Sequence, residues 1–103
     1  MLDQFVRAIA EKIRERFRPQ KVILFGSTAT GNASDESDID LLVIMETQLP
    51  PFRQASLIRQ YLDDSFGVSR AIDIIVRTPE VVEQRIKEGD FFLKTATERG
   101  IAL

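Results

Sequence analysis

The chain has 103 residues, with 14 lysines and arginines against 16 aspartates and glutamates, and it contains neither histidine nor cysteine. This composition excludes a disulfide framework, a thiolate nucleophile, a cysteine-based zinc site and a histidine-dependent catalytic triad. Any chemistry must therefore use carboxylates, hydroxyls, Lys or Arg, together with a hard metal that prefers oxygen ligands. The length predicts a single domain over residues 1–103.

Charge and hydropathy also restrict the partners and the compartment. The net charge of −2 predicts no stable binding to nucleic acid and no attraction to an anionic membrane. The longest uninterrupted apolar run covers only residues 41–45, far short of the roughly 20 residues that span a bilayer. The first residues lack the basic-then-apolar pattern of a signal peptide. These features predict a soluble cytoplasmic protein.

The first half of the chain shows a helix, a strand, a loop and a second strand. Apolar residues three and four positions apart predict an amphipathic helix that ends at Pro19, with the stripe Leu2, Phe5, Val6, Ile9, Ile13 and Phe17. Residues 22–25 are typical of a short buried strand, and the polar segment 31–37 predicts a surface loop. Residues 39–45 predict a central strand. The short connection between these two strands favours antiparallel pairing.

The second half continues the alternation of helices and strands. A second apolar stripe predicts a helix that ends before Gly67, formed by Phe52, Ala55, Leu57, Ile58, Tyr61 and Leu62. Residues 71–76 predict a third strand. Thr78 predicts the capped start of a short helix, and Asp90 predicts the cap of the last helix. With a short helix after the first strand, this order predicts an α/β fold with a small mixed sheet of three or four strands flanked by helices.

Gly26 and Ser27 follow the first strand directly. Glycine lets the main chain approach a ligand closely, and a helix that starts at Ser27 would offer free N–H groups to a phosphate. An ordinary strand-to-helix turn explains the same pair of residues. The spacing from Gly26 to Gly31 matches a P-loop, but Asn32 and Ala33 stand where a P-loop has Lys and Ser or Thr. We therefore reject a P-loop NTPase.

Three aspartates are candidates for chemistry. Asp38 and Asp40 lie two positions apart at the start of the second predicted strand, so their side chains point to the same face. Asp73 lies inside the apolar third strand. Each feature alone has a plain explanation, namely a solvated strand start for the pair, and for Asp73 an edge-strand position or an ion pair with Arg70 or Arg77. If the two strands are neighbours, however, the three carboxylates can surround a divalent metal, which is the equipment for metal-assisted phosphoryl or nucleotidyl transfer.

The spacing of these motifs carries a family resemblance. Residues 24–27 read Leu-Phe-Gly-Ser, and after ten further residues the segment 38–43 reads Asp-Ile-Asp-Leu-Leu-Val. This arrangement resembles the Gly-Ser plus D-x-D signature of the DNA polymerase β-like nucleotidyltransferases, and more closely the minimal nucleotidyltransferase (MNT) domains of prokaryotes. The resemblance includes the leading helix, Asp73 and the closing segment 98–103, so it covers nearly the whole chain. It implies a polymerase β-like nucleotidyltransferase fold.

The resemblance also implies roles for the candidate residues. Asp38 and Asp40 would hold Mg²⁺, as one or two ions. Asp73 would be the third carboxylate, which completes the second metal site or acts as general base. Gly26 and Ser27 would bind the triphosphate of the nucleotide, expected to be ATP.

Relatives of this kind are similar to the antitoxin half of a two-gene system whose partner is a HEPN-domain ribonuclease. The resemblance therefore implies transfer of AMP to a tyrosine of a HEPN toxin. Family members often carry arginines where this chain has Thr28 and Thr30, which favours a second reading, an antitoxin that neutralises its partner by binding without catalysis. A third reading is transfer to a small molecule, against which we count the lack of a second domain in a chain of this length.

Overall fold

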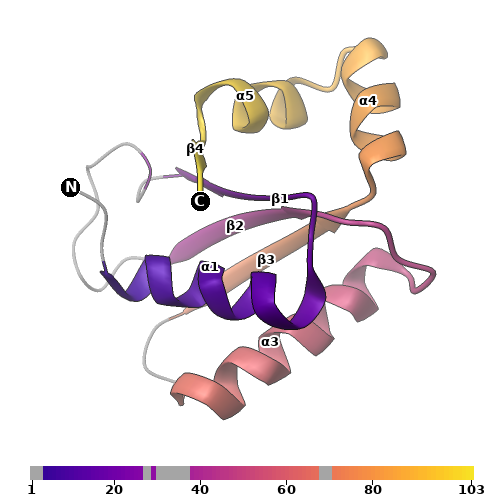
Figure 1. Cartoon of the computed structure of the whole chain (residues 1–103). Helices are drawn as coiled ribbons and strands as arrows, with labels where there is room; N and C mark the ends of the chain where they lie inside the picture. The colour runs from indigo at the N-terminus through magenta and orange to yellow at the C-terminus, as the bar shows by residue number, and fades with distance from the viewer. Residues whose placement is uncertain (1–3, 27–28, 30–37, 68–70) are drawn as a thin grey trace.

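The computed structural model describes residues 4–26, 29, 38–67 and 71–103 (Figure 1). None of the helices in these residues is both long enough and apolar enough to cross a membrane. The elements, in chain order, are α1 (Gln4–Phe17), β1 (Lys21–Phe25), β2 (Ile39–Ile44), α3 (Pro51–Phe66), β3 (Ile72–Arg77), α4 (Pro79–Lys87), α5 (Phe91–Arg99) and β4 (Ile101–Ala102).

The four strands form one mixed sheet in the order β3-β2-β1-β4. β1 pairs antiparallel with both β2 and β4, whereas β2 and β3 are parallel. The predicted α/β fold with a small mixed sheet is confirmed, and so is the antiparallel pairing of the first two strands. β3 lies at one edge of the sheet. The two-residue strand β4 lies at the other edge and was not predicted.

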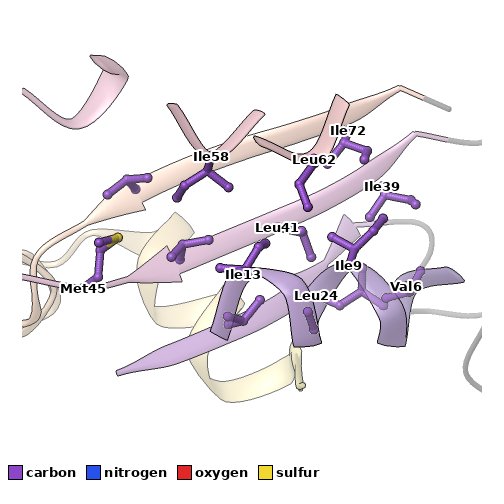
Figure 2. Close-up of a cluster of buried hydrophobic side chains, with 14 residues drawn as sticks. Val6, Ile9, Ile13, Leu24, Ile39, Leu41, Met45, Ile58, Leu62 and Ile72 are labelled. Carbon is purple, nitrogen blue, oxygen red and sulfur yellow. The ribbon is translucent and has the colours of Figure 1, made fainter. Parts of the chain in front are cut away.

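The helices α1 and α3 cover one face of the sheet, and the main core lies between these layers (Figures 1 and 2). Alternate residues of β2 point into this core, so Ile39 and Leu41 are fully buried there. From the helices, Ile9 and Ile58 pack against the same cluster. The α1 stripe is confirmed over its described residues, whereas Leu2 lies outside them.

The helices α4 and α5 lie on the opposite face of the sheet (Figure 1). Both begin with the predicted caps. The Thr78 hydroxyl accepts a hydrogen bond from the N–H of Val81 at 3.3 Å, and the Asp90 carboxylate accepts one from the N–H of Leu93 at 2.9 Å. This layer covers a smaller cluster of buried residues, namely Ile23, Leu42, Ile44, Val82, Leu93 and Ala96.

The predicted apolar stripe of α3 is partly wrong. Phe52 is 74% exposed and Leu57 is 49% exposed. The buried row instead runs at intervals of four residues through Gln54, Ile58 and Leu62. Gln54 is tolerated in this row because its side-chain oxygen accepts a hydrogen bond from the Thr47 hydroxyl at 2.7 Å. Position on the helix therefore overrides hydropathy in deciding which side chains this helix buries.

Candidate active site

Phe25, Asp40 and Asp73 form a row across the sheet. The pairing register places Phe25 of β1 beside Asp40 of β2, and Asp40 beside Asp73 of β3. Ile39 and Leu41 point into the main core, so Asp40 between them points to the face that carries α4 and α5. Asp40 is half-buried and Asp73 is exposed. The predicted adjacency of the second and third strands is therefore present, with the two carboxylates side by side.

The Asp40 carboxyl responds to burial and to its acidic neighbours. Burial raises the pKa of the Asp40 carboxyl above its ordinary value, and the charge of Asp73 raises it further. A hydrogen bond with the Asp73 side chain and the charge of Asp38 act in the same direction. A divalent cation bound here would relieve this repulsion, and carboxylate oxygens are the ligands that Mg²⁺ prefers. The chemistry of the donor set thus fits the expected metal.

Asp38 lies just before β2 and is exposed. It is close enough to affect the pKa of Asp40 through its charge. Within the described part of the chain, however, no three acidic side chains are grouped closely enough to hold one ion. The structure therefore brings Asp40 and Asp73 together, and a metal site shared by all three aspartates stays a prediction.

Gly26 contacts the carboxylate row directly. Its φ of +76° lies in the left-handed region, which residues with a Cβ rarely adopt. A Cβ atom at this position would also collide with the carboxylate of Asp40. A glycine is thus required here for both conformation and space. Ser27, Thr28 and Thr30 lie outside the described residues, so the phosphate-binding role of Gly26 and Ser27 stays a prediction.

The edge position of β3 explains how Asp73 is accommodated. Its carboxylate is exposed, so the high cost of burying a charge in an apolar strand does not arise. Of its two candidate ion-pair partners, Arg70 lies outside the described residues. The guanidinium of Arg77 donates to the main-chain carbonyl of Val76 at 2.7 Å. The plain expectation that Asp73 occupies an edge strand is confirmed.

Arg59 of α3 also lies at this edge and was not identified from the sequence. Its guanidinium donates a hydrogen bond to the main-chain carbonyl of Ile72, next to Asp73. It also forms an ion pair with Asp63 one helical turn away, at 3.3 Å. The spacing of four residues between Arg59 and Asp63 is the signal that sequence reasoning could have used.

A pocket of about 330 Å³ lies on the β1 side of the carboxylate row. The Phe25 ring packs edge to face against Phe92 of α5, with ring centroids 5.3 Å apart. No local sequence pattern indicates this pocket, because α5 is distant from β1 along the chain. The residues that line it are Phe25, Gly26, Ala29, Phe92, Thr95, Ala96, Arg99 and Gly100.

Comparison with known proteins identifies the class of enzyme. The family model of the nucleotidyltransferase domain matches residues 6–103, so the chain belongs to this family and is a nucleotidyltransferase. Among its relatives is the protein adenylyltransferase MntA of Thermococcus cleftensis, 27% identical over 77 residues, which are 75% of each chain. A Methanocaldococcus jannaschii protein, provisionally named as a protein adenylyltransferase, is 46% identical over 43 residues, 42% of this chain and 41% of that one. The resemblance to minimal nucleotidyltransferases is confirmed.

Two solved structures share the fold. One is the crystal structure of a provisionally assigned nucleotidyltransferase from Sulfolobus solfataricus, with a TM-score of 0.62 and 19% identity over 96% of this chain and 76% of that chain. The other is the BolA domain of SufE1 from Arabidopsis thaliana, with a TM-score of 0.61 and 19% identity over 78% of this chain and 98% of that chain. Two differently named proteins match equally well, so the layered fold alone does not define the chemistry.

Proposed function

We propose that this chain transfers AMP from ATP to a hydroxyl group of a partner protein in a Mg²⁺-dependent reaction. The acceptor in this proposal is a tyrosine of a HEPN-domain toxin, and the chain acts as its antitoxin. The names of the relatives as protein adenylyltransferases support transfer to protein. The structural observation that carries the proposal is the adjacency of Asp40 and Asp73, with Gly26 packed against the Asp40 carboxylate.

The proposed reaction gives each carboxylate a separate task. The acceptor oxygen forms a bond to the α-phosphorus of ATP, the bond from that phosphorus to the bridging oxygen breaks, and pyrophosphate leaves. Asp73 takes the proton of the attacking hydroxyl, because it is exposed at an edge strand where an acceptor can reach it. Asp40 and Asp38 would hold the divalent ion, which would neutralise part of the phosphate charge when bound.

The position of Asp73 also supports a macromolecular acceptor. β3 is an edge strand, so the approach to Asp73 is open from outside the sheet. Asp40, by contrast, is half-buried between two neighbouring strands. A hydroxyl presented on the surface of another protein can therefore reach Asp73 without entering a deep cavity.

The test is transfer of label from ATP labelled at the α-phosphate to a purified HEPN-domain protein, the proposed acceptor. We expect Mg²⁺-dependent labelling of that protein, lost when its acceptor tyrosine is replaced by phenylalanine. Asp73→Asn should slow transfer by about 10²–10⁴-fold, the usual contribution of a general base. Asp64→Asn is the matched control, because Asp64 is an exposed aspartate of α3 whose side chain accepts a hydrogen bond from Gln60, one helical turn away. Unlabelled toxin, or equal rates for Asp73→Asn and wild type, contradicts the proposal.

Thr28 and Thr30 favour a second candidate, neutralisation of the toxin by contact alone. Cells that express the toxin distinguish the two candidates. If transfer is required, the double variant Asp40→Asn/Asp73→Asn fails to rescue growth although it still forms the complex. If contact suffices, the double variant rescues growth as well as wild type does.

A further inference from the structure

The pocket beside Phe25 has no role in the proposed reaction so far. We propose that it binds the nucleobase and ribose of the donor nucleotide, an inference that rests on the proposed function. The acceptor then approaches from the opposite side of Asp40, where Asp73 lies. The nucleotide and the acceptor are thus assigned to the two sides of one carboxylate.

The location of the pocket supports this assignment. Phe25 and Gly26 belong both to the pocket wall and to the surroundings of Asp40. Gly26 is also the residue from which the predicted phosphate-binding segment begins. A ligand that places its phosphates at Gly26 and Asp40 can therefore extend into the pocket without crossing the sheet. Asp73 lies on the far side of Asp40 and stays accessible to the acceptor.

The lining of the pocket suits a flat aromatic ring. Phe25, Phe92 and Ala96 provide apolar surface, and the residue Phe92 is 42% exposed. Aromatic side chains stack on nucleobases of any sequence because every base has a π-face. The volume of about 330 Å³ falls within the range of small-molecule sites, roughly 300–1,000 Å³.

The remaining lining residues contribute polar groups and a tightly packed boundary at the end of α5. Thr95 and the exposed Arg99 add a hydroxyl and a positive charge to the lining, which suit the ribose and the anionic part of a nucleotide. Gly100 lies so close to β1 that a Cβ there would collide with Ile23, the Leu24 carbonyl and the Ala96 carbonyl. The end of α5 is therefore packed against β1 and holds the pocket residues in place.

An aromatic acceptor side chain is the competing occupant of the pocket. The position of the groups argues against it. The proposed proton acceptor Asp73 lies two strands away from β1, with Asp40 between them. An acceptor hydroxyl in the pocket would be on the wrong side of Asp40 for proton transfer to Asp73.

The experiment compares the binding of ATP with that of inorganic tripolyphosphate, which has no base, by titration calorimetry in the presence of Mg²⁺. Phe92→Ala should weaken ATP binding by about tenfold, since base–aromatic stacking contributes roughly 1–3 kcal/mol. It should leave tripolyphosphate binding unchanged. Phe91→Ala is the matched control, because Phe91 is the preceding residue, is 80% exposed and does not line the pocket. A second variant, Thr95→Trp, fills the pocket and should abolish the preference for ATP over tripolyphosphate.

Three results would overturn the inference. The first is that wild type binds no ATP, or binds it no more tightly than tripolyphosphate. The second is that Phe92→Ala and Thr95→Trp both leave the affinity for ATP unchanged. The third is that Phe92→Ala weakens the binding of ATP and of tripolyphosphate equally. The proposed function fails separately. If ATP binding depends on Phe92 but no label reaches the HEPN protein, the proposed transfer is wrong and the nucleotide-binding pocket stands.

Discussion

The face of the sheet under α1 and α3 and the face under α4 and α5 differ in how completely they exclude water. Among the described residues, the cluster between the sheet and the helices α1 and α3 contains fourteen buried hydrophobic side chains. The cluster between the sheet and the helices α4 and α5 contains six. The second face also carries the row of Phe25, Asp40 and Asp73, where the acidic groups remain partly or fully accessible. Stability therefore depends mainly on the first face, which leaves the second face free to hold charged groups and a pocket.

The largest expected effect is the loss of unfolding free energy when one of two adjacent leucines of β2 is replaced, one on each face of the sheet. Leu41 and Leu42 are both fully buried in β2, and they point to opposite faces. Replacing a buried leucine by alanine costs about 2–5 kcal/mol of unfolding free energy, and less where the surroundings can close the cavity. We expect Leu41→Ala near the upper end of this range and Leu42→Ala near the lower end, measured by urea unfolding. A larger loss for Leu42→Ala contradicts the division between the faces.

The next effect concerns the glycine that borders the carboxylates. Gly26 and Gly67 share a φ of +76°, but a Cβ would meet Asp40 at Gly26 and nothing within 4 Å at Gly67. Gly67→Ala should cost only the backbone strain, about 1–3 kcal/mol, because its φ of 76° with ψ of 173° lies in a region essentially restricted to glycine. Gly26→Ala should cost roughly 1–3 kcal/mol more because Asp40 must move. Equal losses of unfolding free energy in the two variants would contradict this prediction, because they would show that the Asp40 side chain can move away from position 26 without cost.

A smaller effect is expected at the start of α5, the helix that carries the pocket residue Phe92. Asp90→Ala removes the side-chain cap on the N–H of Leu93 and should cost about 1 kcal/mol. Asp90→Asn is the control, because asparagine caps equally well but lacks the charge that contacts Arg85 at 3.9 Å. A loss for Asp90→Asn as large as for Asp90→Ala would assign the effect to the charge.

The smallest effect is a pH dependence at Asp40. Its pKa is raised in the folded protein, so the folded state holds the proton more tightly, and stability falls as the pH rises from the ordinary value of 3.8 through the raised pKa. Asp40→Asn should therefore raise Tm at pH 7 slightly, by less than the roughly 4–8 °C that 1 kcal/mol gives in a domain of this size. The gain should vanish below pH 3.8. Added Mg²⁺ should stabilise wild type more than the variant, and a gain that is independent of pH contradicts this account.

Local patterns in the sequence predicted most of the fold. The continuous apolar run of β2 identified a central strand, and the hydroxyl and carboxylate caps at Thr78 and Asp90 identified two helix starts. The alternation along β2 also separated Asp40 from the core residues Ile39 and Leu41. These features depend on neighbours in sequence, so the sequence alone contains them.

The features that were missed depend on contacts between distant segments. A two-residue strand such as β4 is too short to show alternation, and its pairing with β1 defines it. The contact between Gly26 and Asp40 follows from the register of β1 and β2, and the meeting of Phe25 with Phe92 follows from the packing of α5 on the sheet. The adjacency of Asp40 and Asp73 was predicted only on the condition that their strands are neighbours.

The arginines at the edge of β3 have a consequence for self-association. Main-chain carbonyls at an open strand edge can recruit a strand from a second copy of the protein. The carbonyls of Ala71 and Arg77 bond to β2, so by alternation those of Ile72, Ile74 and Val76 face outward. The side chains of Arg59 and Arg77 bond to two of these three, those of Ile72 and Val76. Two of the three outward carbonyls are thereby withdrawn from pairing with a second copy, while the Asp73 side chain stays exposed. The hydrogen bonding of this single strand therefore opposes edge-to-edge association at the edge that carries Asp73.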